Sequence, residues 1–179
     1  MSKITKIAFF ETTKKQEIYI TNKLSGEHNL FFSQLALGED IAFLEKVYDA
    51  EIICVFVGSN VNKSVIESFP NLKAICTMST GFDHIDTEFA KSKNIAVCTV
   101  PTYGQNTVAE HAMSLILAIS RKLIVSNEKI KKGKFDSKKI CGFDLKNKNI
   151  SIIGCGNIGK HLAKMCHGFE MNISIYDIN

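Results

Sequence analysis

Residues 149–177 read NISIIGCGNIGKHLAKMCHGFEMNISIYD, and this stretch decides the fold of the second part of the chain. An apolar strand at 149–153 runs into Gly154, Gly156 and Gly159, which open a helix with apolar side chains at helical spacing. A second strand, NISIY, ends at Asp177. Strand, glycine turn, amphipathic helix, strand and terminal acid follow the order of a dinucleotide-binding βαβ unit, so the pattern predicts the start of a Rossmann domain.

Each glycine has a physical task in such a unit. Gly154 permits a tight turn, Gly156 lets backbone N–H groups approach a pyrophosphate, and Gly159 lets the helix pack close to the strand. The carboxylate of Asp177 is placed to accept hydrogen bonds from the adenosine ribose and would repel a 2′-phosphate, which favours NAD over NADP. A glycine-rich turn in an ordinary α/β unit is the alternative. The helix is expected to bury Ile158, Leu162, Met165 and Cys166.

Upstream of this unit, short apolar runs alternate with segments of helical periodicity. A helix is expected from about Thr13, which has capping-box spacing with Gln16. The alternation predicts an α/β fold with a parallel sheet covered by helices on both faces. Ligands of such sheets bind beyond the carboxyl ends of the strands, which directs attention to the loops 78–86 and 100–107. The apolar runs that read as buried strands are 6–10, 28–33, 51–58, 72–78 and 95–100.

The longest predicted helix spans 107–123, with Thr107 and Glu110 at capping-box spacing. Its segment 112–119 is apolar almost all round, which indicates a helix that is covered on every side, between domains or between subunits. The stretch KIKKGKFDSKK at 129–139 is basic. Because no arginine and only one aromatic residue interleave with these lysines, we interpret it as a solvated helix end and loop rather than a nucleic-acid site.

Composition excludes several classes of protein. The 179 residues are 45% hydrophobic and 22% charged, so the chain can bury a core. The run 112–120 is too short to span a membrane, and the N-terminus shows no signal peptide. The six cysteines form neither CxxC nor zinc-ligand spacings, so no metal site is expected. We expect them to be buried, reduced thiols of a cytoplasmic protein.

Three motifs together resemble one family: STGFDHID at 79–86, VPTYGQNTVAEHA at 100–112 and GCGNIG at 154–159. The chain is similar to the D-isomer-specific 2-hydroxyacid dehydrogenases, in the D-lactate dehydrogenase-like branch. The resemblance implies a flavodoxin-like parallel-sheet substrate domain at residues 1–100. It implies that residues 101–179 are the start of a Rossmann NAD-binding domain, incomplete here and limited to its first βαβ unit. Family members use NAD to interconvert 2-oxo and D-2-hydroxy acids and are usually dimers, so we expect a homodimer formed through the long helix and no nucleic-acid or membrane partner.

The resemblance also implies roles for residues that match its motifs. Ser79, Thr80 and Gly81 match a loop whose backbone faces the substrate carboxylate, and Tyr103 matches a tyrosine that lines the substrate cleft. Thr107 matches a residue near the nicotinamide end of the cofactor. The pyrophosphate loop and the ribose acid are matched by Gly154, Gly156, Asn157, Ile158, Gly159 and Asp177.

No residue of this chain is assigned as catalytic, because the family's arginine, glutamate and histidine lie later in the nucleotide domain. The only arginine, Arg121, lies in the long helix and does not match. His84 and His111 sit at non-catalytic motif positions and are expected to have structural roles. Met78 stands where this family often has arginine, and the family's usual tryptophan is absent.

The leading interpretation is the N-terminal part of an NAD-dependent oxidoreductase acting on the CH–OH group of D-2-hydroxy acids, inactive as this chain alone. A non-enzymatic NAD-binding regulatory protein and an inactive fragment are the alternatives, since fold does not fix function. The sequence does not name the substrate, because relatives that oxidise formate and phosphite share much of this pattern.

Overall fold

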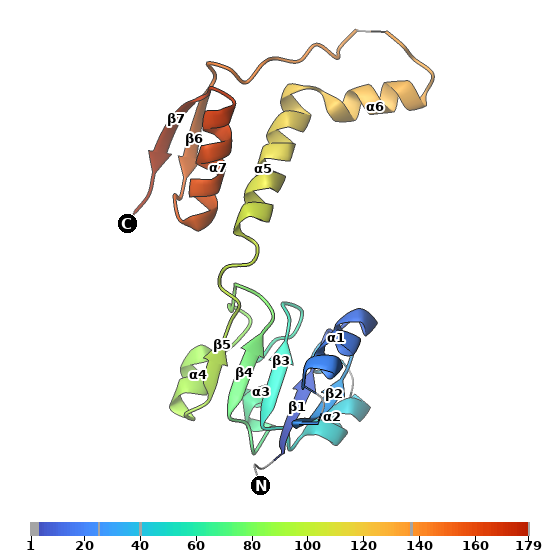
Figure 1. Ribbon diagram of the computed structural model, residues 1–179, viewed down its shortest axis with the longest axis vertical. Helices are drawn as coiled ribbons and strands as arrows, with labels where there is room; N and C mark the ends of the chain where they lie inside the picture. The colour runs from blue at the N-terminus through green and yellow to red at the C-terminus, as the bar shows by residue number, and fades with distance from the viewer. Residues whose placement is uncertain (1–3, 25, 40, 137, 179) are drawn as a thin grey trace. The chain divides into compact units, whose positions relative to one another are not determined.

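The computed structural model describes residues 4–24, 26–39, 41–136 and 138–178 (Figure 1). The chain divides into two compact units, Met1–Thr102 and Tyr103–Asn179. The first unit consists, in chain order, of β1 (Thr5–Phe9), α1 (Lys14–Leu24), β2 (His28–Phe32), α2 (Ile41–Val47), β3 (Ile52–Val55), α3 (Lys63–Glu67), β4 (Ala74–Thr77), α4 (Thr87–Ser92) and β5 (Ala96–Cys98). The second consists of α5 (Gln105–Ser120), α6 (Leu123–Lys131), β6 (Asn149–Ile153), α7 (Asn157–Gly168) and β7 (Asn172–Tyr176).

The first unit is built on a five-stranded sheet with the order β2-β1-β3-β4-β5. All neighbouring strands are parallel (Figure 1). This confirms the predicted α/β fold, and the strand order is that of the flavodoxin-like doubly wound sheets. The helix expected from Thr13 is also confirmed. Thr13 and Gln16 form a reciprocal capping box, with the N–H of Thr13 bonded to Gln16 Oε1 at 2.8 Å.

Apolar side chains project from both faces of this sheet, and for this reason the strands are continuous apolar runs in the sequence. On one face Phe10, Ile53 and Ile75 belong to a cluster that also takes in residues of α2, α3 and α4. Ile53 is fully buried, and such burial stabilises a fold by about 1.5–3 kcal/mol. On the other face Phe9 and Cys54 pack with Ile20 and Leu24 of α1, among others.

Two predicted boundaries are wrong for reasons that lie outside the local sequence. β3 ends at Val55 instead of running to Gly58, because the N–H groups of Phe56 and Gly58 donate to the carboxylate of Glu11 at 3.0 and 2.8 Å. The long helix spans Gln105–Ser120 rather than 107–123. Lys122 takes a left-handed conformation with a φ of 54°, and a separate helix, α6, follows it.

The N-terminus of α5 also differs from the prediction. Gly104 is the N-cap, and no side chain of the described residues caps the helix, so Thr107 lies inside the first turns rather than at the cap. Glu110, the expected partner of Thr107, instead accepts a hydrogen bond from the side-chain amide of Asn106. The predicted second capping box is therefore wrong.

The second unit contains the predicted βαβ arrangement, with β6 and β7 parallel and Ile150 opposite Ile173. Figure 1 shows α7 beside these strands and α5 beside α7. Ile158 is 44% exposed, so its predicted burial is wrong, whereas Cys166 is fully buried. The core of this unit is built from Met113, Leu145 and Cys166, with Ile116, Leu117, Ile150, Leu162, Met165, Met171 and Ile173 packed against them.

The cysteines differ in environment more than expected. All six are free thiols, and Cys54 and Cys166 are buried as predicted. Cys98 and Cys141 are exposed, so the prediction of burial is wrong for these two. Cys98 lies on β5, which is an edge strand of the sheet formed by the described residues. Among the helices of the described residues, none is long and apolar enough to cross a lipid bilayer.

Candidate functional site

The loop that follows β4 is held from within by a chain of hydroxyl groups. The Ser79 side chain, in a residue only 4% exposed, donates to the carbonyl oxygen of Gly81 at 2.7 Å and lies 2.6 Å from Thr77 Oγ1. Thr77 Oγ1 in turn lies 3.2 Å from Nε2 of His84. The Ser79 hydroxyl is thus engaged inside the protein, and His84 has the hydrogen-bonding role expected of a structural histidine.

A second set of contacts ties this loop to the segment after β5. Thr80 Oγ1 donates to the carbonyl of Val100 at 2.9 Å, and the N–H of Val100 donates to the carbonyl of Ser79 at 3.0 Å. Within the part of the chain that the structure describes, the backbone N–H groups of Thr80 and Gly81 have no protein acceptor. Both residues are exposed. Two adjacent N–H donors therefore remain available at the carboxyl end of β4, an arrangement that suits a carboxylate or another small anion.

Glu11 shapes the neighbouring loop and was missed by the sequence analysis. It lies two residues after the end of β1 with a φ of 57°, and its carboxylate accepts hydrogen bonds from the N–H groups of Phe56 and Gly58 and from the hydroxyl of Ser59. A Cβ atom on Gly58 would lie 2.6 Å from Glu11 Oε1, so only glycine fits there without displacing the carboxylate. The available signal was an acidic residue next to a buried strand, at the sheet edge where ligands bind.

In the second unit, the glycine turn connects β6 to α7. Gly154 has a φ of 90°, a left-handed conformation that glycine adopts at little cost. A Cβ atom on Gly159 would lie 2.2 Å from the carbonyl oxygen of Gly154, so the helix approaches the turn more closely than any side chain permits. Within the described part of the chain, no side chain caps α7 at Gly156, which leaves the first N–H groups of the helix to a ligand or solvent. Asn157 and Ile158, in the first turn, are exposed.

Asp177 lies next to this turn. It follows β7 directly, and its carboxylate accepts a hydrogen bond from the N–H of Cys155. The N–H of Gly154 donates to the carbonyl of Tyr176 at 2.8 Å, which holds the turn against the end of β7. The structure thereby gathers the predicted pyrophosphate loop and the predicted ribose acid at one end of the two-stranded sheet.

The other candidates lie elsewhere. Tyr103, which is 61% exposed, and Thr107, also exposed, belong to the start of the second unit, on or next to the first turns of α5. Ser79, Thr80 and Gly81 belong to the first unit. Among the described residues, no group of three or more histidine, cysteine, aspartate or glutamate side chains is arranged to hold a metal ion.

Comparison with known proteins places the chain in one family. The family described as D-isomer specific 2-hydroxyacid dehydrogenase, catalytic domain, matches residues 7–171. A putative D-lactate dehydrogenase of Dictyostelium discoideum is 33% identical over 160 residues, which cover 88% of this chain and 46% of that protein. A D-3-phosphoglycerate dehydrogenase of Methanocaldococcus jannaschii is 38% identical over 134 residues, 75% of this chain and 26% of that protein.

Solved structures give the same result. The D-lactate dehydrogenase of Aquifex aeolicus, solved with NAD and lactic acid, superposes with a TM-score of 0.89 at 28% identity. The match covers 97% of this chain and 51% of the Aquifex chain. This chain therefore spans between about a quarter and a half of the length of these relatives.

Proposed function

The chain belongs to the D-isomer-specific 2-hydroxyacid dehydrogenase family, and on this premise we propose that it is the N-terminal part of an NAD-dependent oxidoreductase. The proposed reaction interconverts a 2-oxo acid and a D-2-hydroxy acid in the cytoplasm, and the proposed protein is a homodimer. The observation that carries the proposal is the pair of N–H donors at Thr80 and Gly81, which have no protein acceptor among the described residues.

A 2-oxo acid presents a carboxylate next to its reactive carbonyl, so the protein must hold the carboxylate while the carbonyl is reduced. In this proposal the N–H groups of Thr80 and Gly81 bind the carboxylate, and the bonds to Val100 keep the loop in position before substrate arrives. Positioning of this kind removes part of the entropic barrier to the reaction. Met78 adds no positive charge beside the loop, so in this proposal the backbone N–H groups bind the substrate carboxylate there without help from a cation at position 78.

NAD supplies the hydride when it is bound. The residues that would hold it are those at the end of the β6–β7 sheet, where a close helix, an uncapped helix N-terminus and a carboxylate meet. Gly154, Gly156 and Gly159 would cradle the pyrophosphate at the start of α7, where the helix dipole favours negative charge. Asp177 would orient the adenosine ribose, and its charge favours NAD over NADP.

The test uses this chain joined, after Asp177, to the part of the Aquifex aeolicus enzyme that the match does not cover; we call this the extended protein. Gly81→Pro removes the N–H donor, and Gly81→Ala keeps it. The alanine Cβ would meet only Asp83 Oδ2 at 3.9 Å, so alanine fits. Loss of a hydrogen bond to a charged group costs about 1.5–3 kcal/mol, so Gly81→Pro should raise the KM for pyruvate or hydroxypyruvate by about 10- to 100-fold.

The control, Gly81→Ala, should leave KM within about twofold, and circular dichroism shows whether both variants are folded. Equal KM values for the two folded variants would mean that this loop does not bind the substrate carboxylate. The choice among 2-oxo acids is tested in the same assay, since the relatives compared above include a putative D-lactate dehydrogenase and a D-3-phosphoglycerate dehydrogenase.

A further inference from the structure

Three cysteines form a continuous row across the first sheet. Cys54 on β3 is paired in register with Cys76 on β4, and Cys76 with Cys98 on β5. Residues in register on parallel strands project from the same face, so the three thiols lie side by side. Parallel neighbours are about 4.8 Å apart, which lies within the Cα separation of about 4.4–6.8 Å that a disulfide needs.

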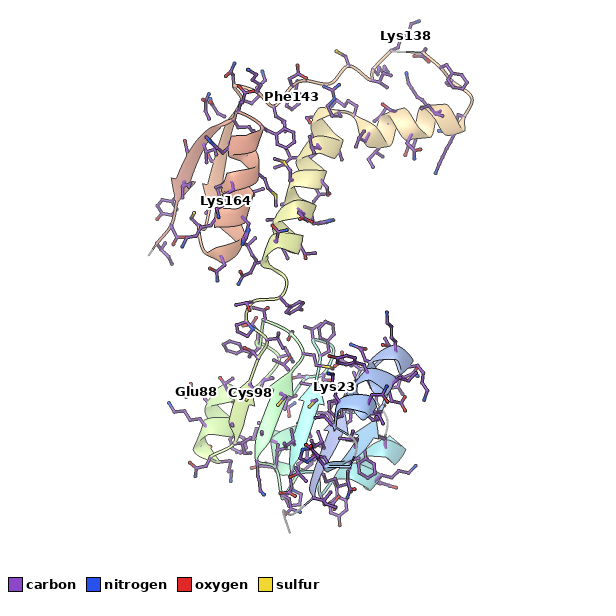
Figure 2. The ribbon with its side chains drawn as sticks, viewed as in Figure 1. Lys23, Glu88, Cys98, Lys138, Phe143 and Lys164 are labelled. Atoms are coloured by element: carbon purple, nitrogen blue, oxygen red, sulfur yellow. The ribbon has the colours of Figure 1, made fainter. Side chains whose placement is uncertain are left out.

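The row runs from the interior to the surface. Cys54 is 8% exposed and belongs to the cluster packed against α1, Cys76 is half-buried, and Cys98 is exposed on the edge strand, where Figure 2 labels it. Two residues earlier, the same face of β4 and β5 carries Ala74 and Ala96, which are paired in register. These small side chains flank Cys76, which is partly exposed, and Cys98, which is exposed.

The three thiols also differ in pKa. Hydrogen bonding from Cys54, with a smaller contribution from Cys98, outweighs burial and lowers the pKa of Cys76 from 9.0 to about 7. The pKa of Cys54 is raised by its hydrogen bond to Cys76 and by burial. The negative charge of Cys76, followed by desolvation, raises the pKa of Cys98. Cys76 therefore has the lowest pKa of the row and ionises before the thiols on either side.

We propose that Cys76 and Cys98 form an oxidation site for hydrogen peroxide, at which Cys76 becomes a sulfenic acid and Cys98 closes a disulfide onto it. In the first step the Cys76 sulfur attacks one peroxide oxygen; an S–O bond forms, the O–O bond breaks and hydroxide leaves. In the second step the sulfur of the Cys98 thiol attacks the Cys76 sulfur; an S–S bond forms, the S–O bond breaks, and the departing hydroxide takes up the Cys98 proton and leaves as water. The hydroxide of the first step becomes water by taking up the proton that Cys76 released when it ionised. Two thiols are oxidised and one peroxide is reduced to two waters.

The test treats the 179-residue chain with hydrogen peroxide, alkylates the remaining thiols and maps peptides by mass spectrometry. We expect a peptide pair linked through Cys76 and Cys98, which dithiothreitol separates. Cys98→Ser should stall the reaction at a Cys76 sulfenic acid that dimedone traps, whereas Cys76→Ser should leave Cys98 open to alkylation. Cys54→Ser is the matched control from the same row and should still form the disulfide.

The pH dependence of the first step gives a second readout. The titratable groups that face Cys76 from the adjacent strands are the thiols of Cys54 and Cys98, and α1 contributes apolar Ile20 and Leu24 to this cluster. Its thiolate fraction should rise about tenfold between pH 6 and pH 8 and then level off, and dimedone labelling of Cys98→Ser should follow it. The proposal is overturned if wild-type Cys76 and Cys98 both remain alkylatable after peroxide, or if they are oxidised no faster than the exposed Cys141.

Discussion

At the residue scale, Asp177 is a side chain with two tasks. Its carboxylate already accepts the N–H of Cys155 and so fixes the end of β7 against the glycine turn. In the proposed function the same group discriminates against a 2′-phosphate by charge repulsion, which is strongest where water is excluded. A single substitution therefore probes cofactor preference.

Replacing Asp177 with serine in the extended protein should narrow the preference for NADH over NADPH by about 10- to 100-fold in kcat/KM, because the charge is lost. Asp144→Ser is the control: Asp144 pairs with Arg121 at 3.0 Å on the surface, where ion pairs contribute little. Steady-state rates with NADH and with NADPH, measured for both variants, give this preference. Equal use of NADH and NADPH by the unmodified extended protein would contradict the role given to Asp177.

Gly159 makes a prediction about stability rather than cofactor choice. An added Cβ would lie 2.2 Å from a backbone oxygen that cannot move freely, so Gly159→Ala should lower the free energy of unfolding by about 1–3 kcal/mol. Gly168, at the other end of α7, has nothing within 4 Å of the added atom. Gly168→Ala should be neutral or stabilising by up to about 1 kcal/mol. Urea denaturation of both variants measures the difference, and similar losses would contradict a close helix–turn contact.

At the scale of elements, α5 has two unlike faces. Ala109, Met113 and Ser120 are buried inside the second unit. Val108, Leu115 and Ile119, spaced at i, i+7 and i+11, are 49%, 52% and 65% exposed. An exposed apolar stripe on a helix is typical of an interaction surface. We therefore propose that the predicted homodimer forms through this stripe of α5.

Leu115→Lys should convert dimers into monomers or cause aggregation, because it places a charge in the middle of the stripe. Ile124→Lys is the control, since Ile124 on α6 is 66% exposed and lies outside the stripe. Light scattering of both variants and of the unmodified chain gives the oligomeric state. An unchanged state for Leu115→Lys would show that the stripe is not the contact.

The elements also show how far the sequence predicts this structure. Apolar runs located each strand, and the Thr13–Gln16 capping box located the start of α1, because these signals are local. The early end of β3 depends on Glu11, which is 45 residues from Phe56 in the chain.

The end of α5 depends on distant residues in a similar way. The carbonyl of Ser120 accepts the N–H of Phe143, and the adjacent Gly142 approaches so closely that a Cβ would lie 2.1 Å from that carbonyl oxygen. The candidate site shows the same difference between features set by local sequence and features set by distant residues. The glycine turn and Asp177 are local in sequence and were predicted. The Glu11 contacts and the bond from Thr80 to Val100 arise only when segments distant in the chain meet.

At the scale of the whole molecule, each unit carries one part of the proposed reaction. The first has the anion-binding loop after β4, and the second has the glycine turn. The β6–β7 sheet leaves Ile153 84% exposed and Tyr176 65% exposed, so its second face offers apolar surface to further structure. We expect the chain alone to bind NAD weakly at best, because a two-stranded sheet supports only the pyrophosphate and part of the adenosine.

The central claim, that this chain supplies the substrate loop and the start of the NAD site of a D-2-hydroxyacid dehydrogenase, is tested most directly by one rate measurement. NADH oxidation is followed with pyruvate, glyoxylate and hydroxypyruvate for the 179-residue chain and for the extended protein, against a protein-free blank. The account predicts that the chain matches the blank and that the extended protein shows saturable turnover with at least one 2-oxo acid. Saturable turnover by the chain alone, or none by a folded extended protein that binds NADH, would contradict it.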